Sequence, residues 1–235
     1  MVNKITINKI TIEKLKPTKK KFKNKNGKFS AQGHIQDLKV KIYEVFDQKQ
    51  GNLREFISNH KELSLYFPKL IAYDSNYIVE EWINGQTLKE ANYQNTKMNA
   101  LSSEVKNIIY LMWSVKYDDL VFDYINYIHK RVNKINNFNL KNLPIRINHN
   151  DLSLDNILVT SNGLKIIDNE FLGCNNGWIL NIKNSFLKED LKYQNFVSSD
   201  TINLLWDIRR EWSHLKLKNS KNMREKLHNI IKKIL

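Results

Sequence analysis

The feature that most constrains this chain is a polar loop that runs directly into an apolar hairpin. The loop has the pattern His-x-Asp-Leu-x-x-x-Asn, with His149, Asp151 and Asn156 at its defined positions. Residues 157–167 follow as two apolar stretches around an Asn-Gly pair, which favours a tight turn between antiparallel strands. Because a hairpin reverses the chain, Asp168 is expected at the same end of it as Asn156. An ordinary polar hairpin, with Asp151 and Asn156 as turn residues, is the alternative.

This stretch resembles the catalytic loop and metal-binding segment of the protein-kinase-like superfamily. It is most similar to the branch that holds aminoglycoside phosphotransferases, choline kinases and bacterial lipopolysaccharide-core sugar kinases. The resemblance implies an enzyme, a kinase that uses ATP and Mg²⁺ to phosphorylate a hydroxyl group. It also implies an α+β, two-lobed protein-kinase-like fold, with a small β-rich N-lobe over residues 1–83 and a mainly helical C-lobe over residues 84–235.

The chemistry of phosphoryl transfer supports a role for each residue of this stretch. Catalysis rests mainly on positioning and on charge neutralisation. By the resemblance, Asp151 orients and deprotonates the attacking hydroxyl, and His149 braces the loop by hydrogen bonding. Asn156 and Asp168 offer the oxygen ligands that a hard cation such as Mg²⁺ prefers. Glu170 either adds an acidic group near the metal or is a solvated charge, and the sequence leaves both open.

Strands dominate the first third of the chain. Apolar and polar residues alternate over residues 5–13 and 38–46, which predicts two strands. Apolar residues at helical spacing predict a helix over residues 52–64. Two short apolar stretches follow, over residues 70–73 and 77–83, and an Asn-Gly pair ends the second. This order of strands around one helix agrees with a nucleotide-binding N-lobe.

The resemblance also assigns the residues that would bind ATP. A kinase-like fold needs a strand lysine that reaches the nucleotide phosphates and a helix glutamate that pairs with it. Lys41 is the candidate lysine and Glu55 its partner, while Lys39 lies on the same strand face and is the rival. The backbone of Glu81 and Ile83 would contact adenine as the superfamily hinge does. An edge strand followed by a turn explains the same residue types equally well.

The sequence departs from the superfamily pattern in several places. It has no Gly-x-Gly-x-x-Gly, and Gly27 and Gly33 are the nearest candidates; the hairpin around residues 26–27, with Lys28 and Ser30, is the phosphate cradle that we consider. The metal segment reads Asp-Asn-Glu where protein kinases have Asp-Phe-Gly. Asn150 stands where an Arg would pair with an activation-loop phosphate, and no Ala-Pro-Glu follows. Because only 67 of the 235 residues follow Asp168, a small acceptor is expected rather than a protein.

The predicted acceptor is a small molecule with a sugar-type hydroxyl, such as a glycolipid or polysaccharide precursor. An aminoglycoside or choline-type kinase is the alternative, and a nucleotide-binding pseudokinase or regulator is another.

Residues 98–138 and roughly 185–235 are helical in pattern, and residues 171–178 between them are loop-like. Trp178 in that loop could stack on a sugar ring, although a core position explains it as well.

The net charge and the single cysteine limit which partners and which cellular compartment are expected. The net charge of +14 attracts phosphates, but an AT-rich coding sequence would give the same Lys-rich composition. No nucleic-acid motif is present, so no nucleic-acid partner is expected, whereas association with a membrane surface through basic residues stays open. No run of about 18 apolar residues predicts a membrane span. The single Cys174 cannot form an internal disulfide, so the expected location is the cytoplasm.

Overall fold

The computed structural model describes residues 3–18, 23, 27–91, 95–124, 127 and 145–176. Two compact units make up the chain. The first unit comprises residues 1–92 and 154–172, and the second comprises residues 93–153 and 173–235. Residues 154–172, which the sequence places in the predicted C-lobe, thus group with the N-terminal strands. The predicted boundary between residues 83 and 84 stays a prediction.

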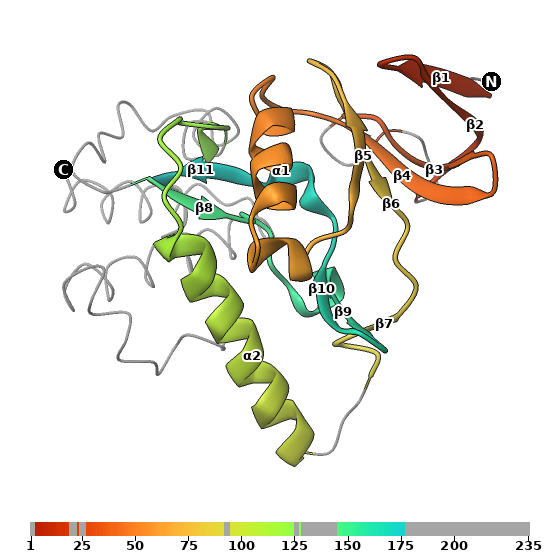
Figure 1. Cartoon of the computed structure of the whole chain (residues 1–235). Coiled ribbons are helices and arrows are strands. Elements are labelled where there is room, and N and C mark those ends of the chain that lie inside the picture. The colour runs from red at the N-terminus through yellow and green to blue at the C-terminus, as the bar shows by residue number, and fades with distance from the viewer. Residues whose placement is uncertain are drawn as a thin grey trace, which may run out of the picture. The chain divides into compact units, whose positions relative to one another are not determined.

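An antiparallel sheet of six strands forms most of the first unit, in the order β1-β2-β3-β4-β6-β5 (Figure 1). Its strands are β1 (Lys4–Ile7), β2 (Ile10–Pro17), β3 (Ser30–Ile35), β4 (Leu38–Glu44), β5 (Leu70–Tyr73) and β6 (Tyr77–Glu81). The predicted alternation in β4 buries Val40 and Ile42 completely on one face. These two side chains join a core with Ile7, Ile12 and Val79. The opposite face of β4 is left for Lys39 and Lys41.

A hairpin at the N-terminus corrects one prediction. Residues 5–13 do not form one strand, because β1 and β2 pair with each other across a two-residue turn. Asn8 (φ 46°) and Lys9 (φ 68°) both adopt positive φ, as a type I′ turn requires. Ile7 lies opposite Ile10 across this turn. The turn contains no glycine, and Asn8 is the residue type that tolerates the left-handed region best after glycine.

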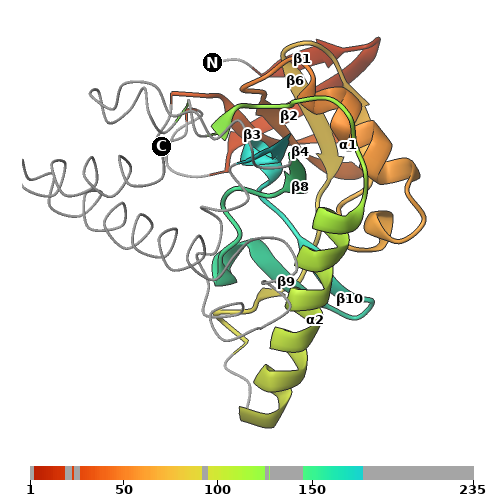
Figure 2. The ribbon, with the colours of Figure 1, turned by 90° about the vertical axis from the view of Figure 1, so that its left-hand side faces the viewer.

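Helix α1 (Gln50–Asn59) contacts β5 and lies beside it in Figure 1, and Figure 2 shows the helix from a second side. The helix predicted over residues 52–64 is confirmed in its first part, but it ends at Asn59 and a short 3₁₀ turn, η1 (Leu63–Leu65), follows. Its buried positions follow helical spacing: Gln50, Leu53, Arg54 and Ile57. Two of these four side chains are polar, so the buried face of α1 needs hydrogen-bonding partners.

The hairpin predicted after the polar loop is present. It consists of β9 (Ile157–Thr160) and β10 (Gly163–Ile166), and β7 (Gln86–Thr87) pairs with β9 on its other side. The 3₁₀ turns η2 (Leu154–Asn156) and η3 (Asn169–Phe171) lie on either side of this hairpin in the sequence. The Ile167 N–H donates to the Asn156 carbonyl at 2.9 Å. The hairpin therefore returns Asp168 to the neighbourhood of Asn156, as predicted.

Helix α2 (Asn95–Ser114) and the paired strands β8 (Arg146–Asn148) and β11 (Gly173–Asn175) belong to the second unit. The helical prediction for residues 98–138 is wrong over residues 115–123, which are not helical, whereas Tyr124 and Tyr127 are helical. Val121 instead pairs with Cys174 in a β-bridge, and Phe122 has a positive φ of 52°. The rest of that prediction lies largely outside the described residues. None of the described helices is long and apolar enough to cross a membrane.

The segment after η3 also differs from its prediction. Residues 171–178 are predicted as a loop, whereas residues 173–175 form β11. This strand pairs with β8, and it lies close to Val121: an added Cβ at Gly173 would be 2.7 Å from the Val121 carbonyl oxygen. Trp178 and the helices predicted over 185–235 lie outside the described residues.

Candidate functional site

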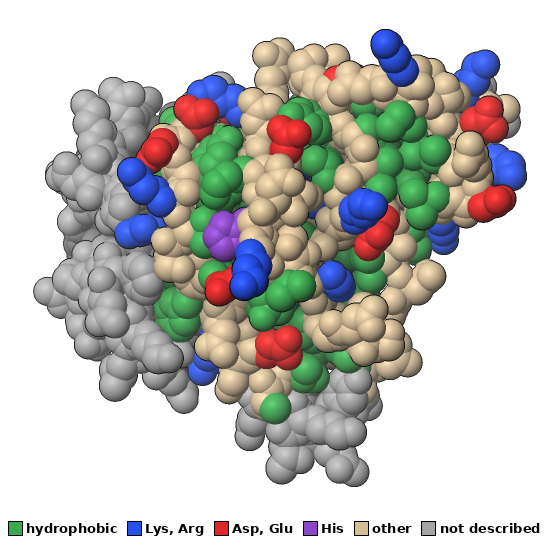
Figure 3. All heavy atoms as spheres, in the orientation of Figure 1, with side chains coloured by type: hydrophobic (Ala, Val, Ile, Leu, Met, Phe, Trp, Pro, Cys, Tyr) green, Lys and Arg blue, Asp and Glu red, His purple; other side chains and the backbone are tan. Residues whose placement is uncertain are grey.

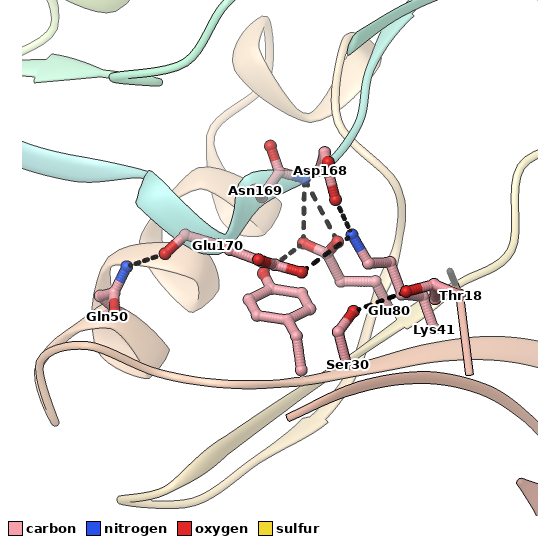
Figure 4. A network of polar contacts seen from close by, with 9 residues as sticks. Thr18, Ser30, Lys41, Gln50, Glu80, Asp168, Asn169 and Glu170 are labelled. Atoms are coloured by element: carbon pink, nitrogen blue, oxygen red, sulfur yellow. Dashed lines mark hydrogen bonds and ion pairs between the residues drawn. The ribbon is translucent and has the colours of Figure 1, made fainter. Parts of the chain in front are cut away.

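Lys41 of β4 meets the acidic segment that follows β10. Its Nζ atom forms an ion pair with Asp168 and lies 3.8 Å from Glu170 Oε1 (Figure 4). Asp168 adopts a left-handed conformation (φ 64°), which begins the η3 turn. The structure therefore brings together three of the predicted site residues.

The charge state of Lys41 follows from these contacts. Burial lowers the pKa of Lys41, but the carboxylates of Asp168 and Glu170 raise it by more, so its pKa lies above the usual value of 10.5. Lys41 is therefore a largely buried cation at neutral pH, with 14% of its side chain exposed. An ammonium group has three hydrogens to donate, so it can contact phosphate oxygens while it stays near Asp168.

The two candidate lysines of β4 have different surroundings. Lys39 Nζ lies 4.1 Å from the centroid of the Trp82 ring, in a cation–π contact. Lys41 contacts the acidic segment instead. Of the two lysines, Lys41 is therefore the one that lies at the acidic segment.

Glu55 does not reach Lys41, which corrects the predicted pair. Glu55 is exposed on α1, and it accepts a hydrogen bond from Tyr73 Oη at 2.7 Å. Successive helical residues are about 100° apart around the axis. Since the side chain of Arg54 faces the interior, the side chain of Glu55 must point away from the interior. The phase of α1 therefore places an arginine where the sequence analysis expects a glutamate.

A cavity of about 420 Å³ lies beside Lys41 within the first unit. This volume is within the usual range of small-molecule sites. Its lining joins the segment after β6 to the acidic segment: Thr18, Lys41, Pro68, Glu80, Glu81, Trp82, Ile83, Asp155, Asn156, Ile167 and Asp168. Five of the predicted site residues, Lys41, Glu81, Ile83, Asn156 and Asp168, thus share one cavity.

The backbone after β6 limits how a base could bind. The Glu81 N–H donates to the Lys69 carbonyl at 2.9 Å, and the Trp82 N–H donates to the Lys39 carbonyl at 3.0 Å. Both N–H groups are thus committed to the sheet. A base in the cavity could therefore meet the carbonyl of Glu81 and the backbone of Ile83, but not the Glu81 N–H.

The predicted phosphate cradle is divided between two sets of contacts. Lys28 Nζ pairs with Glu44 Oε1 at 2.8 Å, whereas Ser30 Oγ and Thr18 Oγ1 share a hydrogen bond of 3.1 Å. Ser30 is therefore hydrogen-bonded to a residue that lines the cavity, Thr18. Lys28 is instead paired with Glu44. Residues 24–26 of the cradle lie outside the described residues.

The first part of the predicted catalytic loop, residues 149–153, belongs to the second unit and follows β8 directly. Asn148, His149 and Asn150 are almost completely buried, and Asp151 is partly exposed. Asn148 Nδ2 donates to Asn175 Oδ1 at 3.1 Å, which ties the loop to β11. Asn150 has a φ of 60°, a conformation that Asn tolerates well.

The oxygen donors of the first unit fit Mg²⁺. The side chains of Asp168 and Asn156 line the same cavity, and Glu170 is a second carboxylate near Lys41. Mg²⁺ usually takes one or two carboxylates and completes its shell with water and substrate phosphates. Among the described residues, no group of three or more His, Cys, Asp or Glu side chains could hold a metal alone. A bound ion would therefore depend on phosphate oxygens as well.

A network of buried polar side chains next to Lys41 cannot be recognised from the sequence alone. Arg54 Nε donates to Glu80 Oε1 at 2.6 Å, and these side chains are 0% and 1% exposed. Asn169 Nδ2 lies 3.2 Å from each oxygen of the same carboxylate. Two signals point to the pair: Glu80 interrupts the apolar stretch 77–83, and Arg54 lies on the inward face of its helix. A charge at an apolar position is usually paired when it is buried.

These features define a protein-kinase-like fold with a nucleotide-sized cavity next to its strand lysine. No family model matches the chain, and no curated protein matches it in sequence. Solved structures do match. The ternary complex of APH(2″)-IIa with streptomycin and ATP has a TM-score of 0.59 and 14% identity, over 92% of this chain and 93% of that chain.

Two further solved structures agree. ADP-bound aminoglycoside phosphotransferase APH(2″)-Ib has a TM-score of 0.53 and 15% identity, over 87% of this chain and 88% of that chain. LicA in complex with AMP has a TM-score of 0.55 and 14% identity, over 94% of this chain and 91% of that chain. LicA is a choline kinase from Streptococcus pneumoniae. The predicted α+β protein-kinase-like fold is confirmed, and so is the predicted resemblance to aminoglycoside phosphotransferases and choline kinases.

Proposed function

We propose that this protein is a kinase that transfers the γ-phosphate of ATP, bound with Mg²⁺, to a hydroxyl group of a small molecule. The observation that carries the proposal is the position of Lys41. Its ammonium group lies between two carboxylates at the wall of a cavity that Asn156 also lines. Structures of the same fold contain ATP, ADP and AMP, which supports an adenine nucleotide as the ligand.

Each residue near the nucleotide has a role in this proposal. Lys41 binds phosphate oxygens of the nucleotide, and its raised pKa keeps the ammonium charged at neutral pH. Asn156 and Asp168 hold Mg²⁺, with Glu170 as a further carboxylate nearby. The metal ion supplies neutralisation of the charge on the phosphates. The carbonyl of Glu81 and the backbone of Ile83 contact the base.

The reacting groups come from the loop of the second unit. Asp151 accepts a hydrogen bond from the acceptor hydroxyl and takes its proton, while His149 braces the loop. The acceptor oxygen forms a bond to the γ-phosphorus as the bond from that phosphorus to the β–γ bridging oxygen breaks, and ADP leaves. Lys41, Asp151, Asn156 and Asp168 are all present, so this set favours a kinase over a pseudokinase.

For the acceptor, we propose a sugar-type hydroxyl on a glycolipid or polysaccharide precursor. An aminoglycoside or an amino alcohol is the alternative, because solved structures of this fold include a complex with streptomycin and a choline kinase. For the location we propose the cytoplasm, because the single Cys174 cannot form an internal disulfide.

The face of the molecule shown in Figure 3 does not favour a nucleic-acid partner. On the face shown in Figure 3, the described Lys and Arg side chains are interspersed with Asp and Glu rather than gathered in one basic field. Non-specific nucleic-acid binding depends on a concentration of positive charge. The net charge of +14 therefore does not by itself indicate such a partner.

The test is ATP consumption with Mg²⁺ against separate panels of sugars, amino alcohols and aminoglycosides. We expect one panel to raise turnover well above the acceptor-free rate, and phosphorylated product to be detectable by mass spectrometry. The Asp151→Asn variant is the control, and it should bind ATP but lose turnover. If this variant keeps near-normal phosphoryl transfer, the role given to Asp151 is wrong.

A further inference from the structure

Glu80 is a buried carboxylate at the centre of the first unit. It is 1% exposed, and it lies on β6 directly opposite Lys41 of β4 in the antiparallel register. Partners opposite each other in such a ladder point to the same face of the sheet. Glu80 therefore lies on the face of the sheet that carries the nucleotide lysine, and it is part of the cavity lining.

Three donors from three different elements converge on this carboxylate. Arg54 of α1 donates to Oε1 at 2.6 Å, and Tyr43 of β4 donates to Oε1 at 3.1 Å. Asn169 of η3 lies 3.2 Å from both oxygens through its amide nitrogen (Figure 4). An ionised carboxylate can only accept hydrogen bonds, so it determines which way the Asn169 amide points.

Arg54 is itself fixed in place. Its Nη2 atom donates to the Pro68 carbonyl at 2.9 Å, and its guanidinium lies 5.3 Å from the centroid of the Phe67 ring. A buried carboxylate requires such a partner, because its desolvation is otherwise strongly unfavourable. The Arg54–Glu80 pair is therefore a rigid attachment point for Asn169.

Asn169 is the residue between the two carboxylates that contact Lys41. Asp168 precedes it in a left-handed conformation, which persists only where the surroundings hold it. Glu170 follows it, and the Glu170 carbonyl accepts a hydrogen bond from Gln50 Nε2 of α1 at 3.0 Å. Helix α1 thus holds the acidic segment directly through Gln50 and indirectly through Arg54 and Glu80.

We propose that Glu80 is a positioning residue, which holds the Asn169 amide and so sets the geometry of Asp168 and Glu170 for Mg²⁺ and nucleotide. Arg54 supports Glu80 in this role. The sequence predicts a contact between a helix glutamate, Glu55, and Lys41. The structure has a different pair instead, in which helix α1 supplies a cation, Arg54, and strand β6 supplies a carboxylate, Glu80. This inference rests on the proposed function, because it assigns a purpose to the acidic segment of that site.

Asn169→Ala is the first test, since it removes the link to the acidic segment and leaves the Arg54–Glu80–Tyr43 contacts intact. Tyr43→Phe is the matched control, because it removes another neutral donor from the same carboxylate and keeps the ring. Calorimetry with Mg·ADP should show affinity weaker by about tenfold or more in Asn169→Ala and by less than about threefold in Tyr43→Phe. Thermal unfolding should show similar small losses of stability in both variants.

A second pair of variants exchanges the donor and the acceptor of the hydrogen bond between residues 169 and 80. Asn169→Asp brings a second carboxylate against Glu80 and removes the donor, so Mg·ADP affinity should fall by about tenfold. Adding Glu80→Gln provides an amide donor opposite that carboxylate and keeps the net charge. The double variant should return to within about threefold of the wild type.

The outcomes separate this inference from the function on which it rests. Equal Mg·ADP affinity in Asn169→Ala and Tyr43→Phe would overturn the positioning role, as would a double variant no better than Asn169→Asp. If Asn169→Ala does not fold, the comparison of Asn169→Asp with the double variant decides the question. If the wild type binds no Mg·ADP, the proposed function itself has failed, and the positioning role falls with it.

Discussion

Lys41 and Asp168 form an ion pair at the wall of the cavity, although 127 positions separate them in the sequence. The pair joins the central strand β4 to the turn that follows β10. It is the contact by which the first unit brings together the lysine that we propose for nucleotide binding and the carboxylate that we propose for metal binding.

Replacing Lys41 with Met should weaken Mg·ATP binding strongly, because the phosphates lose their buried cation and Asp168 and Glu170 are left as adjacent carboxylates. We expect kcat/KM to fall by about a hundredfold or more, which corresponds to about 3 kcal/mol. Lys39→Met is the matched control from the same strand, and it should change kcat/KM by less than about threefold. Equal losses in the two variants would contradict the choice of Lys41.

The Lys41 contact should also be visible in the alkaline stability of the protein. Burial lowers the pKa of Lys41, but Asp168 and Glu170 raise it above 10.5 overall. A raised lysine pKa stabilises the fold fully below the unfolded value of 10.5, and that contribution is lost as the pH rises through the folded value. The difference in unfolding free energy between wild type and Lys41→Met should therefore be flat up to about pH 10 and shrink above it. Urea unfolding at a series of pH values measures this difference, and a decline that begins near neutral pH would argue against a raised pKa.

Helix α1 provides a sharp comparison between neighbouring residues. Arg54→Met leaves the Glu80 carboxylate buried without its cation, so we expect a loss of about 3–5 kcal/mol in unfolding free energy. Glu55→Ala removes one hydrogen bond at an exposed position, and its cost should be below about 1 kcal/mol. Chemical denaturation of the two variants measures both values. The reverse order would mean that Glu55, and not Arg54, is the structurally important charge of the helix.

Cys174 should be chemically inert in the folded protein. Burial raises the pKa of its thiol to about 12, although nearby Arg146 lowers it in part. The thiolate is the reactive form, so a disulfide reagent at about pH 8 should modify Cys174 only after denaturation. Rapid modification of the native protein would show that the thiol is neither buried nor protonated.

The sequence predicts correctly those elements whose structure is determined by residues close together in the chain. The hairpin 157–167 could be predicted because its two apolar strands and its Asn-Gly turn are contiguous. The N-terminal hairpin was missed because Asn8-Lys9 lacks the glycine that usually marks such a turn. Strand β3 was missed because its sequence, Ser-Ala-Gln-Gly-His-Ile, has weak alternation, and it forms by pairing with β2 and β4.

The site was predictable in its residue types but not in all of its contacts. Lys41, Asn156 and Asp168 were found by resemblance, because no local pattern connects residues so far apart. The Glu55 error shows the limit, since the rotation of α1 by one position decides whether residue 54 or 55 faces inward. The Arg54–Glu80 pair required the structure, because two isolated charges in apolar segments do not reveal that they meet.

The most direct test of the central claim is a calorimetric titration of ATP into the wild type and the Asp168→Asn variant, with and without Mg²⁺. The wild type should bind ATP, and Mg²⁺ should strengthen that binding by about tenfold or more. Asp168→Asn should still bind ATP but lose most of the effect of Mg²⁺, because an amide oxygen is a weaker ligand for a hard cation than a carboxylate. A wild-type protein that binds no ATP under either condition would contradict the assignment of this cavity as a nucleotide site.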